Sequence, residues 1–264
     1  MKIFTLLTLL LATVSTFAAT DSLEGTARFS GCSGSLVKFK NQSMQDKAVI
    51  LTAGFCVSGN DNLFVSNSPL ETTIRLFDKD KEFVDEAFKT TKIIYATQTD
   101  TDVALLELEQ TYQEIFDKHG ISPFVVADKN AKVGDKISVI SGFIRVTLDC
   151  FVDAIIFKLV EGKSITRNSY RLGGDYADSG TGGAPMVIPG TRDVLGVTNT
   201  NSTSETTCGE GSVCEVSESG STQVHPETSY GQQITKLNTC LDERANFNLK
   251  QAGCQMPGGD SWVK

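Results

Sequence analysis

Residues 31–56 read GCSGSLVKFKNQSMQDKAVILTAGFC, and this stretch decides the fold that we expect. Two short β-branched runs, Ser35–Phe39 and Ala48–Thr52, are separated by a polar segment. Runs of this length and composition predict two strands. Cys32 and Cys56 lie on either side of the runs, and their local spacing favours a disulfide between them.

The same pattern continues outward over most of the chain. Short, roughly alternating runs are separated by Gly, Asn, Asp and Ser, which predicts an all-β sandwich or barrel. Helical patterns occur at Gln110–Lys118 and from about Gln233 to Leu249. The segment from Gln110 to Ser122 predicts the joint between two β halves of similar size. The other strand-like runs are Thr26–Ser30, Thr73–Phe77, Lys92–Ala96, Val103–Leu108, Phe124–Ala127, Lys136–Ser141, Phe151–Val160, Met186–Ile188 and Val194–Thr198.

Composition and charge narrow the function class. The chain has 264 residues, 40% of them hydrophobic, which is enough apolar material for a large core. Its formal charge is −8 at pH 7 and its basic residues are scattered, so we expect neither nucleic acid nor a membrane as a partner. The two histidines, His119 and His225, are too few for most metal sites, and we expect no metal and no cofactor.

The first nineteen residues have the pattern of a secretory signal peptide. A charge at Lys2 precedes the apolar stretch Ile3–Ala12, and small residues follow it. Cleavage after Ala18 is favoured because a cut after Ala19 would place the bulky Phe17 at a recognition position. The apolar run is shorter than the ~20 residues that a membrane span needs. We therefore expect residues 1–18 to be removed and the protein to be secreted or periplasmic.

Export makes the seven cysteines candidates for disulfides rather than for a metal or redox site. No two of them have the two-residue spacing of a zinc knuckle. The polar stretch Asn199–Ser221 is expected to be a long surface loop. Pairing within each local neighbourhood gives Cys32 with Cys56, Cys208 with Cys214, and Cys240 with Cys254, and leaves Cys150 reduced, although sequence alone does not fix the connectivity.

Three motifs, in order and at compatible distances, resemble those of the trypsin-like serine peptidase family. The first joins Gly31–Val37 to Val49–Cys56, where the family has a strand followed by Leu-Thr-Ala-Gly-His-Cys and bridges the two cysteines. The second, Thr101–Leu108, is similar to the family's Asp-Ile-Ala-Leu-Leu strand. The third, Asp178–Val187, is similar to Gly-x-Ser-Gly-x-Pro.

The resemblance implies a fold of two six-stranded Greek-key β-barrels, packed perpendicular, with the active site in the cleft between them. On this basis residues 19–235 form the peptidase-like domain, with barrel one at about 24–110 and barrel two at about 123–235. Residues 236–264 then form a C-terminal tail, either a short helix or a segment tied by the Cys240–Cys254 disulfide.

The resemblance also assigns the catalytic positions. Asp102 takes the place of the triad carboxylate, and Phe55 stands where the family has its histidine. Two residues compete for the nucleophile position. Counting back from Pro185 places Gly182 there, whereas counting forward from Asp-Ser-Gly places Ser179 there. Gly182 is favoured because each one-residue slip before the strand at Pro185 would exchange its inward and outward faces.

A trypsin-like site without its base and nucleophile predicts a secreted, non-catalytic homologue, which we expect to be a monomer that binds a protein or peptide in its cleft. The alternative is a serine endopeptidase in which Ser179 acts with an unconventional base. His119 in the joint and His225 in the long loop are poor substitutes for the missing imidazole. A third interpretation is a purely structural exported domain without a partner.

Overall fold

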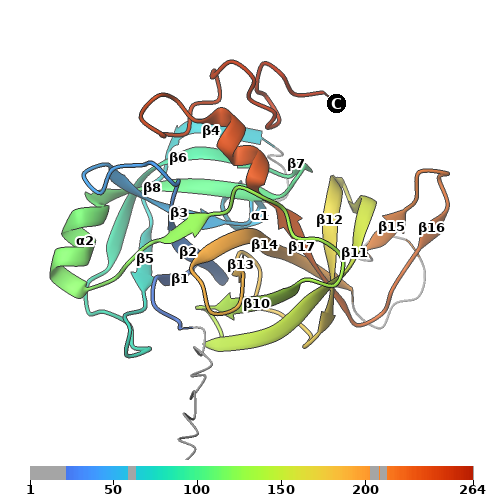
Figure 1. Ribbon diagram of the computed structural model, residues 1–264, viewed down its shortest axis with the longest axis horizontal. Coiled ribbons are helices and arrows are strands. Elements are labelled where there is room, and N and C mark those ends of the chain that lie inside the picture. Colours follow the sequence, from blue (N-terminus) through green and yellow to red (C-terminus); the bar gives the residue numbers. More distant parts are fainter. Residues whose placement is uncertain (1–21, 59–63, 203–207, 209–212, 264) are drawn as a thin grey trace, which may run out of the picture.

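Two closed rings of strands make up most of the molecule (Figure 1). The computed structural model describes residues 22–58, 64–202, 208 and 213–263, so the expected signal peptide lies outside the described residues. No helix in the described part is long and apolar enough to cross a membrane.

Barrel one is a ring of six strands in which each pairs with the next and the last returns to the first. A further strand, β4 (Phe64–Pro69), pairs with β6 outside the ring. In order around the ring the strands are β1 (Thr26–Phe29), β2 (Cys32–Lys38), β3 (Lys47–Thr52), β8 (Val103–Thr111), β6 (Phe88–Thr97) and β5 (Thr73–Leu76).

Barrel two is also a ring of six strands, in which each strand pairs with the next and the last returns to the first. Outside the ring, a small hairpin of β15 (Cys214–Val216) and β16 (Thr222–Gln223) pairs with the end of β11. In order the ring strands are β10 (Lys136–Ser141), β11 (Val146–Glu161), β12 (Ser164–Gly174), β17 (Thr228–Gln233), β14 (Asp193–Ser202) and β13 (Pro185–Val187).

The core explains why β3 has an uninterrupted apolar sequence. Ala48 and Ile50 face the interior of barrel one. Val49 and Leu51 face a second cluster, which also contains Val197 from β14. Since both faces of β3 are buried, the period-two alternation of a half-exposed strand is absent there.

The joint between the barrels contains one helix and one short strand. Helix α2 (Tyr112–His119) begins with a capping box, because the Thr111 hydroxyl accepts from the Glu114 N–H while the Glu114 carboxylate accepts from the Thr111 N–H. Strand β9 (Phe124–Val126) then runs parallel to both β2 and β14. A second parallel contact joins β7 (Thr99–Asp100) to β12, and together these pairings fix the barrels against each other.

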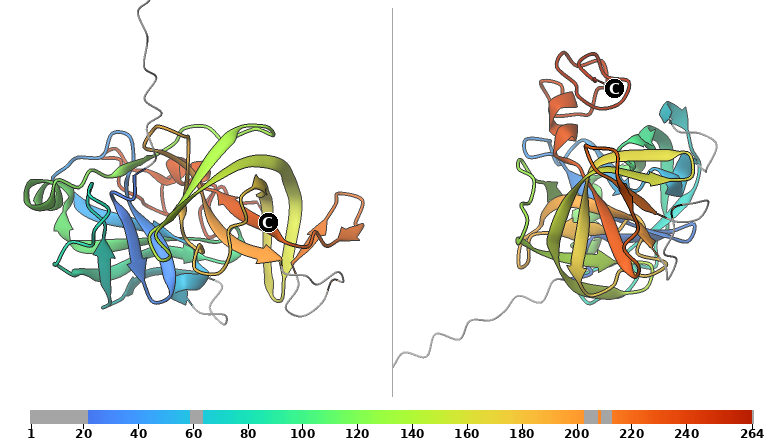
Figure 2. Two further views of the ribbon diagram at one scale, coloured as in Figure 1. Left: turned by 90° about the horizontal axis from the view of Figure 1, so that it is seen from below. Right: turned by 90° about the vertical axis from the view of Figure 1, so that its right-hand side faces the viewer.

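The C-terminal tail packs on the outside of barrel one, over β4 and β6 (Figure 1), and projects above the barrels in the right-hand view of Figure 2. The Tyr95 hydroxyl of β6 donates to the Pro257 carbonyl at 3.1 Å, and the Tyr95 ring lies 5.2 Å from that of Phe247. The helical pattern expected from about Gln233 to Leu249 is wrong beyond Cys240. A 3-10 helix, η1 (Thr235–Cys240), ends there, because the Asp242 carboxylate accepts backbone N–H groups and turns the chain.

Three disulfides are present: Cys32–Cys56, Cys208–Cys214 and Cys240–Cys254, the same pairs that local spacing favoured. Cys150 is reduced and buried, and its burial raises the pKa of the thiol to about 12. The stretch Asn199–Ser221 is not simply a loop, because β14 continues to Ser202 and β15 begins at Cys214.

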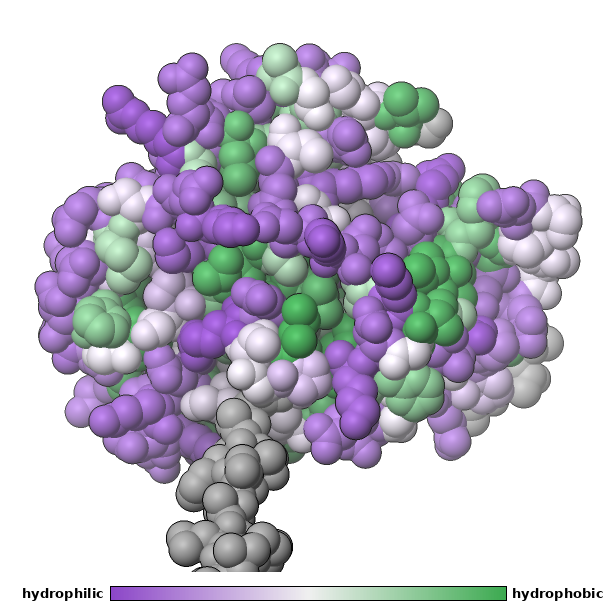
Figure 3. All heavy atoms as spheres, viewed as in Figure 1, coloured by the Kyte–Doolittle hydropathy of each residue, from purple (hydrophilic) through white to green (hydrophobic). Residues whose placement is uncertain are grey.

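Figure 3 shows apolar side chains exposed over the hairpin of β11 and β12. Ile155 and Phe157 on one face of the hairpin, and Ile165 on the other, are 41–44% exposed. This hairpin is long enough to reach the other barrel, where the Ser164 hydroxyl at its tip donates to the Gln98 carbonyl at 3.1 Å.

Candidate functional site

A cleft of about 670 Å³ lies between the two barrels. Barrel one contributes the entrance to β2, the start of α1 (Phe55–Ser58) and the segment before β8. Barrel two contributes the tip of the β11–β12 hairpin, the turn before β13 and the end of β14. The lining residues are Gly31, Cys32, Phe55, Gln98, Asp102, Glu161–Ser164, Asp178–Gly182 and Asn199–Asn201, so all four residues of the expected site lie in one place.

Asp102 is buried beneath the cleft floor with 4% of its surface exposed. Its Oδ1 accepts the Phe55 N–H at 3.0 Å, and the Gly54 N–H and the Asn199 side chain also bond to the carboxylate. Burial raises the pKa of Asp102 to about 7, because desolvation outweighs these three hydrogen bonds. The negative charge of Glu161 at the hairpin tip raises it further.

Phe55 lies against Gly182, the residue that the sequence favoured for the nucleophile position. Its half-buried ring lies against Gly182, where a Cβ atom would be 2.6 Å from the Phe55 Cζ. Such a distance is shorter than real carbon contacts, so a side chain at position 182 would require the Phe55 ring to move. The φ angle of Gly182 is outside the left-handed region, so the close approach of the ring, rather than the backbone, requires glycine here.

Ser179 lies in an exposed turn on the cleft wall rather than against Phe55. Its backbone N–H donates to the Asp178 carboxylate at 2.6 Å. The Ser179 hydroxyl has no hydrogen bond to any part of the chain that the structure describes. No group therefore holds this hydroxyl in the way that a general base holds a serine nucleophile.

The turn at 178–183 keeps two free backbone amides in the cleft. Gly180 has φ +92°, a left-handed conformation that suits glycine, and its carbonyl accepts the Ser33 and Ser141 hydroxyls at 3.0 and 3.2 Å. The Gly182 carbonyl accepts the Ser33 N–H at 2.9 Å. Within the described residues the N–H groups of Gly180 and Gly182 have no acceptor. Two such amides can bind an anionic or carbonyl oxygen.

Comparison with solved structures identifies this architecture. The MamO protease domain from Magnetospirillum magneticum aligns with a TM-score of 0.50 at 14% identity, over 80% of this chain and 92% of that chain. The Rv3671c protease of M. tuberculosis gives 0.47 at 14% identity, over 81% and 85%. The chain has the trypsin-like serine protease fold. No protein-family model and no curated protein matches the sequence, and identities this low establish the fold alone.

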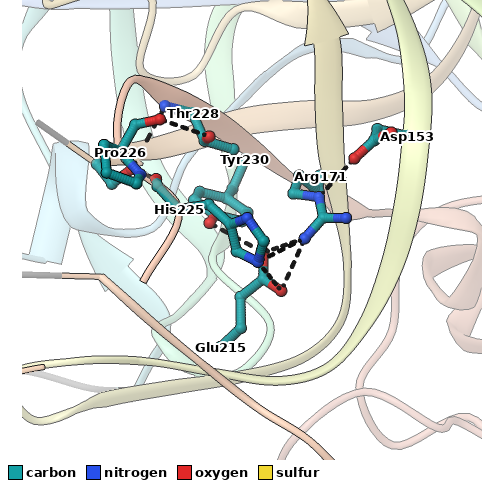
Figure 4. Close-up of polar contacts among 8 residues, drawn as sticks. Asp153, Arg171, Glu215, His225, Pro226, Thr228 and Tyr230 are labelled. Carbon is teal, nitrogen blue, oxygen red and sulfur yellow. Dashed lines mark hydrogen bonds and ion pairs between the residues drawn. The ribbon is translucent and has the colours of Figure 1, made fainter. Parts of the chain in front are cut away.

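Neither histidine of this trypsin-like protein lines the cleft. His119 is the last residue of α2, and its Nε2 lies 2.7 Å from the Glu86 carboxylate. The His225 Nε2 lies 2.9 Å from an Arg171 nitrogen and 3.3 Å from Glu215, in a polar cluster on barrel two (Figure 4). The imidazole expected to be missing from the site is therefore not replaced by either residue.

Sequence reasoning missed two contributors to the trypsin-like cleft. Asn199 bonds to Asp102 from the end of β14, and Glu161 lies at the tip of the β11–β12 hairpin. The signals were present, since polar residues follow the apolar run Val194–Thr198 and a Glu-Gly-Lys-Ser turn follows a long strand. The described residues hold no group of three or more His, Cys, Asp or Glu side chains suited to a metal ion.

Proposed function

We propose that this protein is an exported, non-catalytic relative of trypsin-like proteases that binds a polypeptide in the cleft between its barrels. The observation that carries the proposal is the contact between Phe55 and Gly182, in which the aromatic ring occupies the space that a serine side chain would need. The disulfides and the N-terminal sequence support export to an oxidising compartment.

Peptide hydrolysis by this fold needs a base that accepts the proton of a hydroxyl nucleophile. The Phe55 ring has no proton acceptor, and the Ser179 hydroxyl contacts no base in the described chain. Asp102 bonds to backbone amides and to Asn199 instead of orienting an imidazole. These features argue against the alternative function of a serine endopeptidase.

Binding, in contrast, depends on features that the cleft keeps. The amides of Gly180 and Gly182 have no acceptor within the described chain. Strand β14 pairs with β13 only as far as Val197, so its cleft-side edge at Asn199–Asn201 has no neighbouring strand among the described residues. An open strand edge beside free amides can pair with an extended peptide.

Labelling with a fluorophosphonate tests the non-catalytic part of the proposal. We expect the mature protein to stay unlabelled under conditions that label trypsin, because the reagent needs an activated hydroxyl. The Ser179→Ala variant is the control and should also stay unlabelled. Labelling of the wild type that Ser179→Ala abolishes would establish the endopeptidase alternative.

Selection of phage-displayed random peptides on the immobilised protein tests the binding part. Ser179 is exposed on the cleft wall, so Ser179→Trp should fill the cleft without disturbing the core. Ser219→Trp is the matched control, because Ser219 is exposed in the turn between β15 and β16. We expect peptides that bind the wild type and Ser219→Trp but not Ser179→Trp. Equal binding to all three proteins, or no enriched peptide, would contradict a binding role for the cleft.

A further inference from the structure

Three of the seven arginines gather around Phe83 and Phe143 without acidic partners among the described residues. Arg28, Arg75 and Arg145 are exposed, and in the described chain their guanidinium groups form neither an ion pair nor a hydrogen bond. Other arginines behave differently. Arg167 pairs with Asp100 at 3.1 Å, and Arg171 pairs with Asp153 at 2.6 Å.

Aromatic rings hold the three arginines in place. The Arg28 guanidinium carbon lies 4.5 Å from the centre of the Phe143 ring. The Arg145 carbon lies 4.7 Å from the centre of the Phe83 ring, and the Arg75 carbon lies 5.9 Å from the same point. Such cation–π contacts fix a guanidinium while leaving its N–H groups available to another partner.

The arrangement brings like charges together. Arg28 and Arg75 are directly opposite each other in the β1–β5 pair, where like charges destabilise a sheet. Arg145 joins them from the turn between β10 and β11, over the same ring that Arg75 contacts. An anion at this surface would relieve the repulsion. We define the arginine surface as Arg28, Arg75 and Arg145 together with Phe83 and Phe143.

The arginine surface is continuous with the cleft. A second hollow of about 340 Å³ is lined by Arg28, Arg75, Phe83 and Phe143, and Gly31 lines both this hollow and the main cleft. The Phe143 N–H donates to the Ser33 hydroxyl at 3.1 Å, and the same hydroxyl bonds to the Gly180 carbonyl at 3.0 Å. One buried serine therefore fixes the arginine surface relative to the turn that carries the free amides.

We propose that the arginine surface binds an acidic segment of the polypeptide whose neighbouring residues occupy the cleft. The inference rests on the proposed function and specifies its partner as a chain with clustered carboxylates. Guanidinium groups bind carboxylates through paired N–H donors. A short acidic segment fits better than a nucleic acid, because the net charge of −8 repels a long polyanion whereas three local arginines suffice for a few carboxylates.

The test uses two fluorescein-labelled Gly-Ser peptides, one with four consecutive glutamates and one with four glutamines, in fluorescence anisotropy at low salt. The combined variant Arg28→Gln, Arg75→Gln and Arg145→Gln removes the arginine surface. Its control, Lys132→Gln, Arg244→Gln and Lys250→Gln, removes the same charge from exposed residues elsewhere. We expect the arginine variant to bind the glutamate peptide about tenfold more weakly, since three exposed charge pairs each contribute two- to threefold. The control should stay within twofold of the wild type.

Several results would overturn the inference. These are an equal loss of affinity for the glutamate peptide in both combined variants, equal affinity of the two peptides for the wild type, or no binding of the glutamate peptide. A sulfated oligosaccharide or an oligonucleotide of equal charge that binds more tightly than the glutamate peptide would also overturn it. Circular dichroism verifies that the variants fold, and salt dependence of wild-type binding provides a readout that needs no variant, because an electrostatic contact weakens as salt rises.

Ser179→Trp separates this inference from the proposed function. If Ser179→Trp leaves phage-displayed peptide binding unchanged while the arginine variant loses the glutamate peptide, the cleft proposal fails, and with it the placing of neighbouring residues in the cleft, while binding of an acidic segment by the arginine surface stands. If Ser179→Trp abolishes peptide binding and the arginine variant binds the glutamate peptide as the control does, the cleft proposal stands and the arginine surface fails.

Discussion

Replacing Asp102 with asparagine should stabilise the protein at neutral and alkaline pH. Burial raises the pKa of Asp102 to about 7 in the folded state, from 3.8 for an exposed aspartate. Between these pH values the folded state holds a proton that the unfolded state has released, so the free energy of unfolding falls as pH rises. Above pH 7 the full cost of burying the ionised carboxylate is present. About three pKa units at ~1.36 kcal/mol each give an upper bound of about 4 kcal/mol.

Asparagine suits the site sterically and removes the charge. Its side-chain oxygen can accept the Phe55 N–H, as the carboxylate does now. Its amide can donate to the Asn199 Oδ1, which is buried and without a hydrogen-bond partner in the described structure. The substitution keeps the Phe55 bond and, once the Asn199 amide turns over, replaces the bond that Asn199 now donates with one that it accepts, while it removes the desolvation cost of an ionised group.

Urea denaturation of the mature wild type and Asp102→Asn at several pH values between 4 and 8 measures the effect. The stability difference should be small near pH 4 and grow to a few kcal/mol at pH 8. Asp80→Asn is the control, because Asp80 is exposed in a turn of barrel one and should change stability little at any pH. A variant that is less stable than the wild type at pH 8, or a difference that does not change with pH, would refute the reasoning.

Three further predictions concern the site and the cysteines. Gly182→Ser alone should destabilise the protein by about 1–3 kcal/mol, because its Cβ would overlap the Phe55 ring. Phe55→His alone should give no ester hydrolysis. Only Phe55→His with Gly182→Ser supplies both base and nucleophile, and above-background hydrolysis of an ester substrate measures its recovery. Replacing Cys32 and Cys56 with alanine should lower stability by about 2–5 kcal/mol in thermal or urea denaturation. Iodoacetamide should spare Cys150 in the native protein and, by mass spectrometry, modify only Cys150 in the denatured, non-reduced protein.

Sequence patterns predicted the strands well where short apolar, β-branched runs are buried. The expected runs Ala48–Thr52 and Val103–Leu108 lie within β3 and β8. The pattern misled where polar side chains, not apolar periodicity, determine the path of the chain. The expected helix from about Gln233 stops at Cys240, because the turn at Asp242 depends on hydrogen bonds from one carboxylate.

The site, like the fold, could be predicted from the sequence only in part. Counting back from Pro185 favoured Gly182 over Ser179, and the structure has Gly182 against Phe55 because Pro185 starts β13. The arginine surface could not be read from the sequence. Its members are far apart along the chain, and closure of barrel one by the β1–β5 pair is what places Arg28 opposite Arg75.

The contact between Phe55 and Gly182 joins in one structural feature the two residues that stand at the expected histidine and serine positions. A serine at position 182 would need the ring to move, and an aromatic ring at position 55 needs position 182 to have no side chain. The surrounding frame uses the backbone of this pair and not its side chains, because Ser33 holds the turn through the Gly180 and Gly182 carbonyls and Asp102 accepts the Phe55 and Gly54 N–H groups. Under the proposed function, catalysis is lost while the cleft is kept, because the bonds that shape the cleft do not involve the side chains at positions 55 and 182.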